Sequence, residues 1–236
     1  MTDRPRWGWM EIILVYVCIT VIGYLVSFFY QQLEDLTAGL GMGEAGYFLV
    51  VFLLQFIATL GLVWFFAMVT TGAGWSDLGV KATNLKNLLQ YGLLGGIILI
   101  VTVVLLGLVL KQFAPDVPPQ DFERILRSVH DLKTFLPLLV AGAVLAPFSE
   151  ELYYRGMIYP VFRRHLGPVW GAILAGLLFG LVHFDLWRTI PLAIGGAGLC
   201  YIYEKTQSIW VSTLAHGVWN GFMSMVVYFS VSQGLL

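Results

Sequence analysis

The chain of 236 residues is far more apolar than a soluble protein, with 58% hydrophobic and 11% charged residues and a mean hydropathy of +0.82. These values lie outside the usage of soluble globular domains and predict an integral membrane protein whose main partner is the lipid bilayer. The formal net charge of −1 gives no basic surplus for neutralising phosphates, which argues against nucleic acid as a partner.

Seven segments approach the length that crosses a bilayer. A helix rising ~1.5 Å per residue needs about 20 mostly apolar residues to cross a hydrocarbon core of about 30 Å. In chain order the predicted spans run from Met10 to Tyr30, Tyr47 to Thr70, Leu88 to Leu110, Phe135 to Met157, Pro168 to Phe184, Trp187 to Tyr203 and Ser208 to Ser232. No repeat or polar linker separates a second domain. We expect an all-α fold, a polytopic transmembrane bundle of about seven spans in one domain, residues 1–236.

The loop charges predict an orientation. The first span follows Arg4 and Arg6 in the manner of a signal peptide, but it lacks a small-residue cleavage site and should be retained. Lys and Arg accumulate on the cytoplasmic side of membrane proteins. With seven spans, the loops on the same side as the N-terminal tail contain Lys81, Lys86, Arg163, Arg164 and Lys205. We therefore expect a multi-pass protein of a bacterial plasma membrane with a cytoplasmic N-terminus.

The long loop between the third and fourth spans contains a second helical pattern. Asp121 to Leu132 reads DFERILRSVHDL and follows a break at Pro118 and Pro119. Its apolar residues recur at helical spacing, at Phe122, Ile125, Leu126, Val129 and Leu132. This spacing predicts a short interfacial amphipathic helix.

The fourth span carries ionisable residues, each of which costs about 2.5 to 3.5 kcal/mol at the centre of a bilayer helix. Glu151 and Arg155 stand four residues apart on one face, which predicts a structural ion pair. Glu150 is turned by about 100° from Glu151 and cannot share that face. It is either an acid/base group or a protonated side chain bonded to a neighbouring helix.

Two of the four histidines fall in predicted spans. Phe179 and His183 are four residues apart at the end of the fifth span, and His216 and Asn220 are four apart in the seventh. Taken singly, His183 could be an interfacial side chain, and His216 with Asn220 could be polar contacts between helices. Convergence of these side chains with Glu150 in one pocket is the simplest explanation. At ~1.5 Å per residue, however, His183 lies near 22 Å from the cytoplasmic end of its span, against about 10 Å for Glu150.

Such a pocket suits hydrolysis of a peptide bond. That reaction needs a base for water and donors for the developing oxyanion. No competing nucleophile is indicated, since Ser149 lacks a G-x-S-x-G context and neither C-x-x-C nor H-E-x-x-H occurs. Glu150, His183 and His216 could equally be three ligands of a Zn²⁺ ion with an open position for water, and a metal-free site is equally allowed.

The three elements resemble the EExxxR, FxxxH and HxxxN motifs of the CAAX prenyl endopeptidase and bacteriocin-processing family, also called CPBP or Abi, whose members are described as intramembrane metalloproteases. The matching residues are Glu150-Glu151-Leu-Tyr-Tyr-Arg155, Phe179-Gly-Leu-Val-His183 and His216-Gly-Val-Trp-Asn220. The resemblance covers roughly Phe135 to Tyr228, which we expect to form a peptidase-like core, residues 135–228.

The resemblance implies an intramembrane endopeptidase acting on a membrane-anchored peptide or protein, in CAAX-type or bacteriocin-type processing. It implies that Glu150 and His183 activate a water and that His216 and Asn220 stabilise the oxyanion. Glu151, Arg155 and Phe179 would have supporting roles.

Two other functions remain open. Glu150 and the two histidines could form a proton or ion path in a transporter, although the internal repeats common in transporters are absent. The chain could also be a non-catalytic immunity or scaffold protein of the membrane.

Overall fold

A computed structural model describes residues 5–113 and 118–234, and every regular element in these two ranges is helical. The all-α prediction is therefore confirmed. The first part of the chain contains α1 (Trp9–Phe28), α2 (Tyr30–Gly39), α3 (Gly43–Val63), η1 (Trp64–Val69), α4 (Leu85–Asn87), η2 (Leu88–Leu93) and α5 (Leu94–Lys111). The second part contains α6 (Asp121–Arg127), α7 (Leu132–Val140), η3 (Ala141–Leu145), α8 (Ala146–Glu151), η4 (Leu152–Ile158), α9 (Tyr159–Leu181), α10 (Leu186–Thr206) and α11 (Ile209–Ser232).

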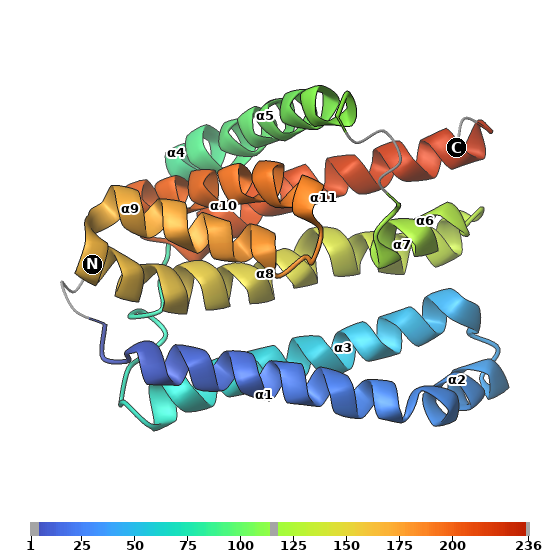
Figure 1. Cartoon of the computed structure of the whole chain (residues 1–236), viewed down its shortest axis with the longest axis horizontal. Coiled ribbons are helices and arrows are strands. Elements are labelled where there is room, and N and C mark those ends of the chain that lie inside the picture. The colour runs from blue at the N-terminus through green and yellow to red at the C-terminus, as the bar shows by residue number, and fades with distance from the viewer. Residues whose placement is uncertain (1–4, 114–117, 235–236) are drawn as a thin grey trace.

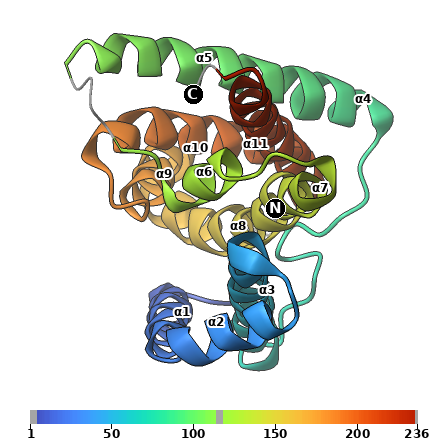
Figure 2. The same ribbon diagram turned by 90° about the vertical axis from the view of Figure 1, so that its right-hand side faces the viewer.

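The helices form three layers. Figure 1 shows α1, α2 and α3 together on one side of the molecule and α5 on the other, with α8 to α11 between them. The end-on view in Figure 2 shows the same order, with α6 and α7 near the middle of the end that faces the viewer. All of the motif residues therefore lie in the middle layer.

Four helical stretches of the described chain are long and apolar enough to cross a membrane: Trp9–Phe28, Gly43–Val69, Leu85–Lys111 and Leu132–Leu181. The last is 50 residues long and contains the predicted fourth span and most of the predicted fifth, which was expected to continue to Phe184. Its helix breaks at Gly167, whose φ of 78° is in the left-handed region that glycine adopts without strain. With 21 and 24 residues, α10 and α11 have the length of a span but are outside this set. The count of about seven spans stays a prediction.

Three glycines let α9 and α10 pack with their backbones in contact. A Cβ atom at Gly176 would lie 2.4 Å from the carbonyl oxygen of Ala193, and one at Gly180 would lie 2.5 Å from that of Thr189. From the other helix, a Cβ at Gly196 would lie 3.0 Å from the Cα of Gly176. Small residues permit this close approach between helices in a membrane, where apolar burial gives little driving force.

The helix that carries the two glutamates is irregular. Two π-helical turns, η3 and η4, flank α8. Such turns insert an extra residue, change the direction of the following side chains and often occur at functional sites. The N-terminal segment supports η4: the indole of Trp7 donates to the carbonyl of Met157 (2.8 Å), and the hydroxyl of Tyr153 donates to that of Ile12 (2.9 Å).

The short amphipathic helix predicted in the long loop is present as α6, but it ends at Arg127 instead of Leu132. A second helix, α7, begins within the predicted stretch, after Asp131, whose carboxylate caps it by accepting from the backbone N–H of Thr134. Ile125 and Leu126 are buried in a cluster with residues of α7 and α11. The apolar face of α6 therefore packs against the protein.

We predict that Gly176→Ala destabilises the protein, because the added methyl group forces α9 and α10 apart. Overpacking of this kind costs about 1–3 kcal/mol and should lower the unfolding temperature measured in detergent. The matched control is Gly107→Ala on α5, where a Cβ atom meets nothing within 4 Å. Equal unfolding temperatures for the two variants would contradict the close packing.

Candidate active site

The predicted ion pair of the first motif lies at the centre of the middle layer. Nη1 of Arg155 is 2.9 Å from Oε1 of Glu151, and the two side chains are 1% and 0% exposed. Nη2 of Arg155 donates to the carbonyl oxygen of Gly196 on α10 at 2.9 Å. The pair therefore joins the helix of the glutamates to α10.

Glu151 also holds His216, a contact that the sequence analysis missed. Nδ1 of His216 is 2.9 Å from the same Oε1 atom, and the imidazole is 2% exposed. A carboxylate only accepts hydrogen bonds, so Nδ1 carries the proton in this contact. The bond fixes the ring of His216 and leaves Nε2 facing the other way.

The second nitrogen of His216 faces Glu150. Nε2 lies 3.6 Å from Oε2 of Glu150, whose side chain is 33% exposed. The carboxylate predicted to be unpaired therefore has a partner, because α11 packs against α8 at this point. Glu150 and Glu151 differ sharply in environment, since one is partly open and the other is fully enclosed.

Phe179 joins the second motif to the other two. Its buried ring is 5.2 Å from the ring of His183 and 5.6 Å from that of His216, centre to centre. The guanidinium carbon of Arg155 lies 4.9 Å from its centre, in cation–π contact. All three motifs thus meet around one aromatic ring.

His183 lies just beyond the end of α9, in the turn before α10. Its Nδ1 is 2.8 Å from the carbonyl oxygen of Phe179. Because a carbonyl oxygen accepts, Nδ1 is protonated here and Nε2 keeps its lone pair. None of the polar contacts within residues 5–113 and 118–234 joins His183 directly to Glu150 or His216. The predicted fifth span extended to Phe184 and included this residue, because the residues before it, Leu177 to Val182, are all apolar or glycine.

Asn220 follows His216 by one turn of α11. Its Nδ2 donates to the carbonyl oxygen of Gly142 in η3 at 3.2 Å. A carboxamide nitrogen carries two hydrogens, so one N–H remains for another acceptor.

The three candidate metal ligands are not arranged as a ligand set. In the part of the chain that the structure describes, no three His, Cys, Asp or Glu side chains are grouped to hold a metal ion. Glu150 and His216 face each other, and His183 binds the carbonyl of Phe179 through Nδ1, which leaves its Nε2 free. As placed, the three side chains are not grouped as the three-ligand zinc site that was one of the two alternatives left open by the sequence.

Comparison with known proteins finds a match to one family model and to curated relatives. Residues 132–222 match the family model described as type II CAAX prenyl endopeptidase Rce1-like. The chain is similar to "Putative membrane peptidase YdiL" of Bacillus subtilis (strain 168), with 24% identity over 98 residues, 41% of this chain and 40% of the relative. It is also similar to "UPF0177 protein YaiF" of Lactococcus lactis subsp. lactis (strain IL1403), with 33% identity over 85 residues, 34% of this chain and 36% of the relative.

These alignments thus span about two fifths of the length of each curated relative. No solved structure matches the chain. The region matched by the family model contains all three motifs, from Glu150 to Asn220. The predicted family resemblance is therefore confirmed over residues 132–222 of this integral membrane chain.

Proposed function

We propose that this chain is an intramembrane endopeptidase that hydrolyses a peptide bond in a membrane-associated peptide or protein, with its peptidase core in residues 135–228. The observation that carries the proposal is the continuous contact from Glu151 through His216 to Glu150. It puts an imidazole of fixed orientation beside a carboxylate that is partly open. The Rce1-like match and the peptidase name of the Bacillus relative support the same reaction.

In the proposed reaction Glu150 is the general base. It accepts a proton from water as the water oxygen attacks the scissile carbonyl carbon, and it returns that proton to the amine of the leaving peptide. His183 assists through the lone pair of Nε2, which its bond to Phe179 leaves available. Glu150 and His183 therefore both act on the attacking water.

The oxyanion is the second requirement. With a proton on Nε2 as well as on Nδ1, His216 can donate to the oxygen on which charge develops, and the remaining N–H of Asn220 can donate to the same oxygen. Glu151 holds the ring of His216 in place, and the bond from Asn220 to Gly142 fixes its carboxamide. Glu151, Arg155 and Phe179 support these groups without touching the substrate.

We predict that Glu150→Gln abolishes cleavage and leaves folding intact. The loss of a general base should reduce kcat by on the order of 10²–10⁴-fold. The side chain is 33% exposed and its contact with His216 is 3.6 Å, so the unfolding temperature should hardly change. The measurement is cleavage of an apolar-flanked peptide in detergent by the variant, with the exposed Glu44→Gln on α3 as the matched control. Equal activity of the two variants would contradict the proposal, and a peptide that is never cleaved would favour a transport or scaffold role.

For Glu151→Gln, in contrast to Glu150→Gln, we predict a loss of stability. Removing the carboxylate leaves the guanidinium of Arg155 buried without a counter-charge, which costs about 3–5 kcal/mol of stability. Replacing both residues, as Glu151→Gln with Arg155→Met, should restore most of the unfolding temperature, because no buried charge remains. The double variant should nevertheless cleave the peptide more slowly than the parent protein, because His216 has lost its charged partner. Full activity in the stable double variant would show that Glu151 does not orient His216.

We also predict that the Arg164 end of α9 faces the cytoplasm and the Phe184 end faces the opposite side. Arg164 precedes the break at Gly167, and Phe184 follows the opposite end of α9, so α9 separates the two. In intact cells a membrane-impermeant thiol reagent should label Phe184→Cys and spare Arg164→Cys. The reverse pattern would overturn the orientation that the loop charges predict.

A further inference from the structure

The turn that carries His183 contains one almost fully exposed aromatic residue. It connects α9 to α10, and Phe184 within it is 89% exposed with a φ of 51°. A residue other than glycine is strained in that backbone conformation, which persists only where the surroundings enforce it. Polar contacts of the residues that follow help to fix this conformation.

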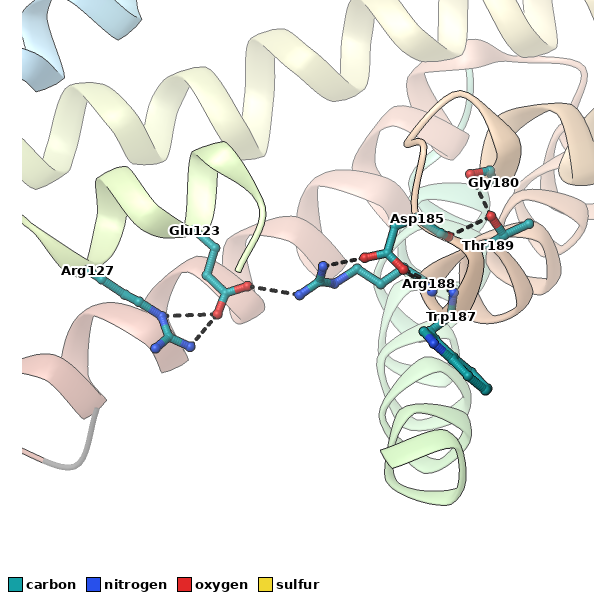
Figure 3. Close-up of polar contacts among 7 residues, drawn as sticks. All are labelled: Glu123, Arg127, Gly180, Asp185, Trp187, Arg188 and Thr189. Atoms are coloured by element: carbon teal, nitrogen blue, oxygen red, sulfur yellow. Dashed lines mark hydrogen bonds and ion pairs between the residues drawn. The ribbon is translucent and has the colours of Figure 1, made fainter. Parts of the chain in front are cut away.

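Asp185 supplies the first of these contacts. Its Oδ1 accepts from the backbone N–H groups of Trp187 and Arg188, both at 3.0 Å, and caps α10 (Figure 3). Its Oδ2 is 2.5 Å from Nη1 of Arg188. Burial raises the pKa of Asp185, but the hydrogen bonds and the charge of Arg188 outweigh it, so the pKa lies below its ordinary value. The carboxylate therefore stays ionised and keeps hold of the arginine.

Arg188 then reaches across to α6. Its Nη2 lies 3.6 Å from Oε2 of Glu123, and Oε1 of Glu123 is 2.5 Å from Nη2 of Arg127. Figure 3 shows these side chains in a row, with charges alternating from Arg127 through Glu123 and Arg188 to Asp185. We call this row the α6 ion-pair chain. It links the turn of His183 to a helix from a distant part of the sequence.

The same helix also touches the Asn220 side of the site. A Cβ atom at Gly142 would lie 2.5 Å from the ring of Phe122, so this ring packs directly on the Gly142 backbone. Gly142 is the residue whose carbonyl binds Asn220. Phe122 and Glu123 are neighbours in α6, and through them one short helix contacts both sides of the site.

We propose that Glu123 and Arg188 are positioning residues, which hold the turn of His183 at a fixed place relative to α11. This inference rests on the proposed function and adds a part to it, because His183 must share one water with Glu150. The pair of Arg188 and Glu123 is 25% and 28% exposed, and such pairs contribute little to global stability. A displacement of about 1 Å, in contrast, can reduce a rate by on the order of 10²-fold. Loss of the pair should therefore appear in catalysis and not in unfolding.

The kinetic test compares Arg188→Gln and Glu123→Gln with the parent enzyme. Each should lower kcat about tenfold, consistent with a small displacement, while KM and the unfolding temperature change little. Arg188→Lys keeps the charge and should restore most of kcat. The matched control is Arg124→Gln, which breaks the exposed 3.3 Å pair with Asp121 on the same helix and should leave kcat unchanged. Parental kcat in Arg188→Gln, or an equal loss in Arg124→Gln, would overturn the inference.

A second measurement needs no activity. Spin labels at Arg124→Cys and Phe184→Cys, in a chain with Cys18 and Cys200 replaced by Ala, report the distance from α6 to the turn. The distribution should be narrow in this parent and broad when Arg188→Gln is added, and an unchanged distribution would overturn the inference. If the distribution broadens but the parent protein cleaves no peptide, the proposed function is refuted. The ion pair would then still be shown to anchor the turn. Cleavage with unchanged distances and rates would refute the positioning role alone.

Discussion

A carboxylate that is removed from solvent has to be compensated where it lies, and the interior of this protein is arranged around that requirement at Glu151. Its two partners, Arg155 and His216, come from its own helix and from α11. Arg155 extends the arrangement to α10 through the carbonyl of Gly196 and to α9 through the ring of Phe179. Uncompensated burial of any of these charges would cost several kcal/mol, about 3–5 for a broken pair. One buried group thus connects α8, α9, α10 and α11, directly or through Arg155.

Glu150 and Glu151 are adjacent in the sequence but lie in different environments. Glu151 faces inward and binds both Arg155 and His216 through Oε1, whereas Glu150, turned by about 100°, keeps an open side and a longer contact to His216. His216 connects the two, since one ring nitrogen binds the buried carboxylate and the other faces the open one. In the proposed reaction the orientation of the imidazole is thus set before any substrate arrives, which is the preorganisation that electrostatic catalysis requires.

Sequence periodicity predicted the features that depend on a single helix. The spacing of Glu151 and Arg155 gave their ion pair, and the apolar pattern gave α6 and the all-α fold. It could not give contacts between helices, such as Glu151 with His216 or Glu123 with Arg188, because a helical period does not say which faces meet. It also missed the π-turns beside α8 and placed His183 within a span, since the end of α9 lies in a stretch with few polar residues. The roles of the site residues stay predictions of the motifs.

If Glu151 sets the tautomer and orientation of His216, as the contact at 2.9 Å indicates, ¹⁵N NMR of the imidazoles will report it. The chain contains 4 histidines, so ¹⁵N-histidine labelling in detergent micelles gives a small set of signals that His216→Gln assigns. The account predicts that the His216 signal shows a protonated Nδ1 whose hydrogen exchanges slowly with water, because the ring is 2% exposed and bonded to a carboxylate. A His216 ring with a bare Nδ1 would contradict the account.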